Sequence, residues 1–133
     1  MTSSADDQIE EARKGDAAVL GHLLESYRNY LRVLARIEIG RLLQGKVDAS
    51  DVIQETFLDA HRHIGSFRGT TEAQFLNWLR EILAGTIANT VRRYFGTQGR
   101  DIRLEQSLLA DINQSSHAFG QIPVDPHSSP SRA

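Results

Sequence analysis

The sequence predicts an all-α protein, a compact bundle of three to four main helices followed by a disordered C-terminal tail. Three observations predict this class. No proline occurs up to Gly120. Apolar side chains recur at three- and four-residue steps along most of the chain, which is the period of a helix with one buried face. No stretch with alternating apolar and polar residues competes as a strand pattern.

The first predicted elements are a short helix over residues 7–13 and a long helical pattern from Ala17 to about Leu43. "KGD" at 14–16 separates them, and Asp16 is the predicted N-cap of the long pattern, because a carboxylate there can accept a first-turn N–H. The long pattern carries one apolar stripe: Val19, Leu20, Leu23, Leu24, Tyr27, Leu31, Leu34 and Ala35. "QGKVD" at 44–48 ends it.

The next helix is predicted from Asp48 to Ile64. Asp48 can cap its N-terminus, and Asp51 lies in the first turn, where the helix dipole favours a carboxylate. Its apolar face consists of Val52, Ile53, Thr56, Phe57, Ala60 and Ile64. "GSFRGT" at 65–70 is the loop that follows this helix.

A second long helix is predicted from Thr71 to about Phe95. Thr71 and Gln74 have the spacing of a capping box. The apolar stripe of this helix consists of Phe75, Leu79, Ile82, Leu83, Thr86, Ile87, Thr90 and Tyr94.

The C-terminal part changes character after a short final helix, predicted around Leu104, Leu108 and Leu109. From Asn113 onwards the chain holds all 3 prolines and many serines. Such a composition buries too little apolar surface to fold alone. The predicted organisation is therefore a helical domain over 1–112 and a flexible linker or tail over 113–133.

The composition bounds the class of protein. The chain has 133 residues, one domain's worth, and no cysteine, which excludes disulfides and thiolate metal sites. The acidic N-terminus has no apolar run of a signal peptide, and no apolar stretch is long enough to span a membrane. We therefore expect a cytoplasmic protein.

The charge is unevenly distributed although the formal net charge is only −2. Residues 1–60 hold 7 basic and 11 acidic side chains, whereas residues 61–103 hold 7 basic and 3 acidic ones. Such asymmetry can mark an anion-binding region. Chance in a small count is the alternative, and charge alone slightly favours it.

Signs of enzyme chemistry are weak. The histidines of "HRH" at 61–63 fall on different helix faces, so they do not form a metal pair, and His63 is expected to pack in the core. No spacing suggests a nucleophile with its base. We expect no enzyme activity, no metal and no cofactor.

The outward face of the helix from Asp48 to Ile64 has two interpretations. The helical wheel places Asp51, Glu55, Leu58 and Arg62 opposite the apolar stripe, with Gln54 beside them. A leucine ringed by polar residues is how a modest docking patch would look, with an apolar centre and a polar rim. A plain solvated face is equally compatible with this pattern.

The outer side of the second long helix is also open to two interpretations. It carries Asn77, Glu81, Ala84, Gly85, Ala88 and Arg92, with Trp78 and Asn89 at its flanks. Trp78 could stack on a base, and Asn89 and Arg92 could bind base edges or phosphates. The alternative is a half-buried core tryptophan, which is the commoner case, beside small residues that face water.

The motifs together resemble region two of bacterial RNA polymerase sigma factors of the extracytoplasmic-function branch. The resemblance rests on "DVIQETF" at 51–57, "FRG" at 67–69, "FLNWL" at 75–79 and the paired arginines at 92–93, in this order, and it covers roughly residues 7–108. It is supported upstream by "LLESYRNYLRVLAR" at 23–36, which matches the first long helix of that family.

The resemblance implies two surfaces. One would dock on the clamp helices of the polymerase beta-prime subunit through Asp51, Gln54, Glu55, Leu58 and Arg62. The other would recognise the minus-ten promoter element, with a non-template base flipped out and held by the loop. Its implied DNA-binding residues are Ser66, Phe67, Arg68, Gly69, Thr70, Thr71, Trp78, Asn89, Arg92 and Arg93.

Two departures from the family pattern limit the resemblance. Many relatives carry Arg-Asn-Leu-Ala and then Asp in the second long helix, where this chain has Ala84, Gly85, Thr86, Ile87 and then Asn89 at the acid position. The promoter sequence is therefore not carried over, and the role of Gly85 is left open. The chain also ends in the linker-like tail, without the region-four helix-turn-helix. The alternative function is a helical protein-interaction module without a DNA role, either a competitor for the polymerase clamp or the target of an anti-sigma factor.

Overall fold

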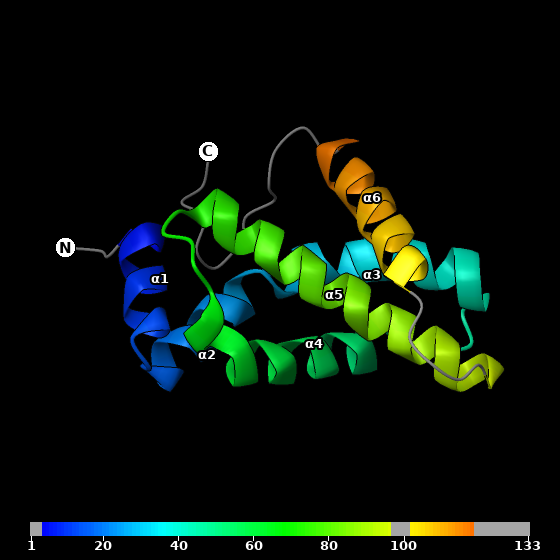
Figure 1. Cartoon of the computed structure of the whole chain (residues 1–133), viewed down its shortest axis with the longest axis horizontal. Coiled ribbons are helices and arrows are strands. Elements are labelled where there is room, and N and C mark those ends of the chain that lie inside the picture. Colours follow the sequence, from blue (N-terminus) through cyan, green and yellow to red (C-terminus); the bar gives the residue numbers. More distant parts are fainter. Residues whose placement is uncertain (1–3, 97–101, 119–133) are drawn as a thin grey trace.

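The computed structural model describes residues 4–96 and 102–118, and every regular element in these ranges is helical. The predicted all-α class is confirmed (Figure 1). Four of the helices have 15 or more residues, in agreement with the predicted number of main helices. The elements are α1 (Ala5–Arg13), α2 (Ala17–Ser26), α3 (Arg28–Leu43), α4 (Ala49–His63), the 3-10 turn η1 (Ile64–Ser66), α5 (Glu72–Phe95) and α6 (Ile102–Ala118).

The long pattern predicted from Ala17 forms two helices, α2 and α3. Asp16 caps α2 as predicted, because its Oδ1 accepts from the Val19 N–H at 3.2 Å. Tyr27 separates the two helices with φ −106° and ψ 5°, and its side chain is buried. The apolar period continues across this bend, which is why the sequence did not reveal it.

The helix α4 begins and packs as predicted. The Asp48 carboxylate accepts from the Ser50 N–H at 2.9 Å. The predicted apolar face is buried from Val52 to Ile64. The opposite face is therefore left to solvent or to a partner.

The helix α5 lies at the centre of the domain and contacts α1, α3, α4 and α6. Figure 1 shows it crossing the molecule between α4 and α6. The predicted capping box is present, since Thr71 and Gln74 each accept from the other's backbone N–H. A further bond comes from α1, where the Asp6 carboxylate accepts from the Glu72 N–H at 3.0 Å.

The predicted start of a flexible tail at residue 113 is wrong, because α6 continues to Ala118. Asn113 accepts from the Arg80 Nε at 2.7 Å, and the Ser116 hydroxyl lies 2.6 Å from that of Tyr30. These polar side chains have the composition of a linker, but partners on α3 and α5 satisfy them. The rest of the predicted tail, from residue 119, lies outside the described residues.

Ala84 and Ala88 are buried, contrary to the predicted exposed outer side of the second long helix. They lie on α5 between Arg80 and Arg92 at four-residue steps, and both arginines bond to side chains of α6. Small side chains let helices approach closely, so α6 packs on this row of α5.

None of the helices in the described ranges is long and apolar enough to cross a lipid bilayer.

Candidate functional site

The outer face of α4, defined as Asp51, Gln54, Glu55, Leu58 and Arg62, lies on the surface as the wheel predicted. Leu58 is 49% exposed in its middle. The Arg62 guanidinium pairs with Asp59 one turn earlier, at 2.6 Å. The arrangement has the apolar centre and polar rim that docking requires.

An ion pair joins the two predicted surfaces. The Arg93 Nη2 lies 3.3 Å from the Glu55 Oε1, which links the outer face of α4 to the end of α5. Both side chains are largely exposed, so the pair is worth only about 0–1 kcal/mol. Either residue can therefore exchange this partner for a stronger one at little cost.

The loop over residues 66–71 is attached to the core through Phe67. Its side chain is only 4% exposed and packs on Phe75 and Trp78, with ring centroids at 5.6 Å and 5.1 Å. The Phe67 side chain is therefore not offered to DNA on the surface of this structure, and its DNA-binding role stays a prediction. The residue instead fixes the loop, because burying an aromatic ring is a large apolar gain.

The Gln74 side chain holds the backbone of the remaining loop residues, and their polar side chains lie outside. The Gln74 Oε1 accepts from the N–H groups of Thr70 and Thr71 at 2.8 Å and 3.1 Å. A Cβ on Gly69 would lie 2.6 Å from the Phe67 ring and 2.7 Å from the Gln74 Cβ, so only glycine fits without movement. Arg68 and Thr70 are exposed.

Ser66 and Thr71 lie at the two ends of this loop. Both are exposed, and their hydroxyls already have backbone partners: Ser66 donates to the His63 carbonyl at 2.9 Å, and Thr71 accepts from the Gln74 N–H at 3.2 Å. The loop is thus shaped by its own hydrogen bonds before any ligand arrives.

The structure supports part of each interpretation of Trp78, because its ring is partly packed and partly exposed. Its ring is half-buried and packs on Phe67 and Phe75, with the Phe75 centroid at 5.6 Å. The core interpretation accounts for the covered part of the ring, and only the remainder faces solvent. The ring therefore supports the loop and is not a free stacking platform.

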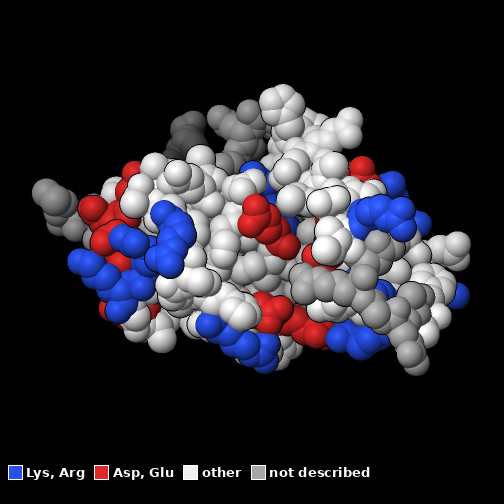
Figure 2. Space-filling view, in the orientation of Figure 1, with Lys and Arg blue, Asp and Glu red and all other residues white. Residues whose placement is uncertain are grey.

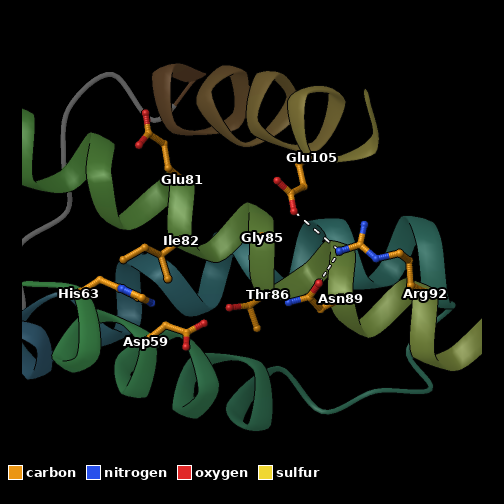
Figure 3. A pocket seen from close by; sticks show the side chains of 9 residues that line it. All are labelled: Asp59, His63, Glu81, Ile82, Gly85, Thr86, Asn89, Arg92 and Glu105. Carbon is orange, nitrogen blue, oxygen red and sulfur yellow. Dashed lines mark hydrogen bonds and ion pairs between the residues drawn. The ribbon is translucent and has the colours of Figure 1, made fainter. Parts of the chain in front are cut away.

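An open groove of about 480 Å³ lies between α4, α5 and α6 (Figure 3). Asp59 and His63 line it from α4 and Glu105 from α6. The lining residues of α5 are Glu81, Ile82, Gly85, Thr86, Asn89 and Arg92. A Cβ on Gly85 would meet nothing within 4 Å, so the glycine widens the groove without being sterically required.

His63 is exposed at this groove, which corrects the expectation of a packed core histidine. The sequence prediction also missed Asp59, Thr86 and Glu105 as groove residues. Asp59 and His63 are one turn apart on α4, and this spacing was the available signal. Glu105 carried no signal, because only the fold brings α6 to the groove.

Arg92 was predicted to bind DNA, but it is held inside the domain. Its side chain is only 12% exposed; it donates to the Asn89 side chain and lies 3.7 Å from the Glu105 Oε2 (Figure 3). Its Nη1 is buried without a hydrogen-bond partner in the described structure, and so is the Thr86 Oγ1 on the groove lining. Buried polar atoms are usually hydrogen-bonded, so both atoms have unused hydrogen-bonding capacity in this arrangement.

The electrostatic character of the groove is mixed. Three carboxylates, Asp59, Glu81 and Glu105, line it together with Arg92 and His63. Figure 2 shows acidic side chains in the centre of this face with basic side chains to either side of them. Within the described residues, no three His, Asp or Glu side chains come together as a metal site requires.

Comparison with known families decides the identity of the helical domain. The model of the family described as Sigma-70 region 2 matches residues 23–94, more than half of the chain. The chain belongs to the sigma-70 region 2 family. The matched segment begins in α2 and ends near the end of α5, so α1 and α6 of this region-two domain lie outside it.

Several curated proteins resemble this region-two domain. The "ECF RNA polymerase sigma-E factor" of Haemophilus influenzae is 34% identical over 113 residues, which are 84% of this chain and 54% of that protein. The "RNA polymerase sigma-H factor" of Pseudomonas aeruginosa is 30% identical over 128 residues, 92% of this chain and 60% of that protein. The sigma-E factor of Escherichia coli (strain K12) is 32% identical over 102 residues, 75% and 48% of the two chains. The predicted resemblance to the extracytoplasmic-function branch is confirmed.

The chain spans about half the length of the curated relatives it matches. No solved structure matches it.

Proposed function

We propose that this region-two domain binds core RNA polymerase and takes part in recognising and opening the minus-ten promoter element during transcription initiation. The observation that carries the proposal is the outer face of α4, where exposed Leu58 directly follows the motif of residues 51–57, inside the segment that the family model matches. The activity is one of binding, and the phosphodiester chemistry belongs to the polymerase. The domain needs no cofactor for it.

The proposed polymerase contact is the outer face of α4 against the clamp helices of the beta-prime subunit. Asp51 and Gln54 are exposed, and Glu55 has only a surface partner in Arg93. These side chains can form charged and polar contacts around Leu58, whose burial would supply the apolar part of the affinity.

The proposed DNA contact consists of the loop over residues 66–71 and the groove beside it. The groove volume of about 480 Å³ lies within the range of small-ligand pockets, about 300–1,000 Å³, and suits one flipped base. Its carboxylates accept hydrogen bonds but repel phosphate. A base with an exocyclic amino group therefore fits the groove better than thymine, while the strand backbone passes outside near Arg68.

The partners that follow from this proposal are core polymerase and the non-template promoter strand, and the place of action is the cytoplasm, where the polymerase works. An anti-sigma factor is a further proposed partner, since the outer face of α4 is accessible to another protein as well. None of these contacts requires a membrane.

A pull-down with core polymerase tests the docking surface. The charge reversal Asp51→Lys/Glu55→Lys is expected to abolish binding of the full chain, and Leu58→Ala is expected to weaken it without changing charge. Asp7→Lys/Glu11→Lys is the matched control, because it reverses two exposed carboxylates on α1. Undiminished binding of the Asp51/Glu55 variant would sink the docking proposal.

The DNA contact is tested with the complex of polymerase and the full chain. We expect it to bind a single-stranded non-template promoter oligonucleotide more tightly than a scrambled strand of the same composition. Equal binding of both at moderate salt would leave only the sequence-independent electrostatic attraction. That outcome would favour the alternative of a protein-interaction module without a DNA role.

A further inference from the structure

The helix α6 lies outside the family segment and rests on α5 and α3 (Figure 1). Its only buried side chains are Leu108 and Ile112, with Leu104 and Leu109 partly buried. An element with so few buried apolar side chains belongs to the less stable parts of a fold. Polar contacts therefore carry much of the attachment of α6.

Three of these polar contacts join an arginine of α3 or α5 to a side chain of α6. The Arg41 Nη1 lies 3.0 Å from the Asp111 Oδ2, and the Arg80 Nε donates to the Asn113 Oδ1 at 2.7 Å. Arg92 pairs with Glu105 at 3.7 Å. Each arginine also keeps a partner outside α6: Arg41 pairs with Glu38 at 2.9 Å, and Arg80 and Arg92 donate to the side chains of Tyr30 and Asn89.

The surface of α5 under α6 carries two arginines on one row of the helix, with only small side chains between them. Arg80 and Arg92 stand twelve residues apart on α5, about 18 Å along the helix axis. Only Ala84 and Ala88 lie between them on this row, so no long side chain interrupts it. The Arg80 Nη1 also donates to the Tyr30 hydroxyl at 2.8 Å, which holds the guanidinium in place.

We infer that α6 is a removable cover on an arginine-lined site for the phosphate backbone of single-stranded nucleic acid. The site consists of Arg41, Arg80 and Arg92, and in the closed state Glu105 and Asp111 stand where phosphates would bind. The guanidinium group binds phosphate oxygens in the same bidentate manner as carboxylates. The inference rests on the proposed function only in that a DNA strand passes the groove beside α5.

The position of Glu105 favours nucleic acid over an acidic protein as the ligand. Glu105 lines the groove proposed for a flipped base and also pairs with Arg92. Release of α6 therefore opens one wall of the groove and frees an arginine beside it in the same movement. The buried, unpartnered Arg92 Nη1 is a donor that the closed state leaves unused.

Two variants of the full chain release α6 in different ways. Leu108→Ala/Ile112→Ala removes the buried apolar contacts of α6 without changing its charge. Glu105→Gln/Asp111→Asn removes the anions and keeps the core, so it carries the test if the first variant fails to fold by circular dichroism. Asp7→Asn/Glu11→Gln on α1 is the control with the same change in net charge.

The measurements are hydrogen exchange of the α6 amides and binding of fluorescein-labelled oligodeoxythymidine without polymerase. A cover closed nine-tenths of the time lowers apparent affinity about tenfold, so both release variants should bind about tenfold more tightly. Adding Arg80→Gln/Arg92→Gln should remove this gain and flatten the salt dependence, by about 0.7 in logarithmic slope for each lost phosphate contact.

Faster exchange in α6 without a gain in affinity would overturn the inference, and so would unchanged exchange in both variants. A gain in the α1 control equal to that of Glu105→Gln/Asp111→Asn would show a mere charge effect and also overturn it. Tighter binding of polyglutamate than of oligodeoxythymidine would assign the site to an acidic protein instead. Because the probe has no promoter sequence and polymerase is absent, these results are independent of those that test the proposed function.

Discussion

Replacement of Gly69 by alanine should destabilise the domain by about 2–3 kcal/mol, at the upper end of the range for an overpacked core position. The added Cβ would lie 2.6 Å from the Phe67 Cζ, 2.7 Å from the Gln74 Cβ and 3.0 Å from the Gln74 Oε1. The first two are well inside van der Waals contact, so the neighbours or the loop must move.

Neither neighbour can move cheaply. Phe67 is 4% exposed and is held between the rings of Phe75 and Trp78. The Gln74 Cβ is fixed by the first turn of α5, and its side chain holds the N–H groups of Thr70 and Thr71. The strain must therefore spread into the loop, with loss of the capping box as one outcome.

The assay is urea denaturation followed by circular dichroism and by the fluorescence of Trp78, the only tryptophan of the chain. A loss of about 2 kcal/mol corresponds to a midpoint lower by about 1 M for a urea m-value near 2 kcal/mol/M. The native emission of Trp78 should also change, because the Phe67 ring lies 5.1 Å from it.

Gly65→Ala is the matched control, since a Cβ there would meet nothing within 4 Å and Gly65 has no positive φ. It should leave stability unchanged or raise it by about 0.4–1 kcal/mol, because alanine restricts the unfolded chain. Equal midpoints and equal emission for the Gly69 and Gly65 variants would refute the steric reasoning.

Three further substitutions test single interactions by urea denaturation. Thr71→Ala should cost about 1 kcal/mol, since it removes the side chain that caps α5. Tyr27→Phe should cost about 1–3 kcal/mol, because the Tyr27 hydroxyl donates to the half-buried Glu72 carboxylate. Glu38→Gln should stabilise the domain at pH 7 and make no difference below about pH 4.5. Burial, opposed by the charge of Arg41, raises the pKa of the Glu38 carboxyl above 4.5. The raised pKa means that the folded protein favours the neutral carboxyl, so this group stabilises the fold fully below pH 4.5. That stabilisation is lost as the pH rises through the raised pKa.

Each of these substitutions has a control of the same chemistry on the surface. Thr70→Ala should be neutral beside Thr71→Ala, and Tyr94→Phe, at a tyrosine 47% exposed, should be neutral beside Tyr27→Phe. Glu11→Gln should show no comparable gain at pH 7. A control that matches its test variant would show that the named interaction does not matter, and a Glu38→Gln gain that persists at pH 4 would contradict the assigned direction of the pKa shift.

Sequence patterns alone were enough to predict the helical class, most element boundaries and the outer face of α4. These features depend on local information. The three- and four-residue apolar period sets which side of a helix is buried, and a cap such as Asp16 or Thr71 binds N–H groups within the next three residues. The family motifs around Asp51 are also local, which is why the resemblance could be stated from them.

The extent of α6 and the exposure of the residues predicted to bind DNA depend on contacts between helices that are distant in the sequence. Tyr30 and Ser116 are 86 residues apart, so no local pattern predicts their contact. A polar segment has the composition of a linker, and only its partners in the fold show that it is a helix. Phe67 is buried because two other rings reach it from α5, and Arg92 is enclosed because Glu105 approaches from another helix. A side chain's type and spacing show what it is able to bind, whereas the packing of distant helices decides whether it is free to do so.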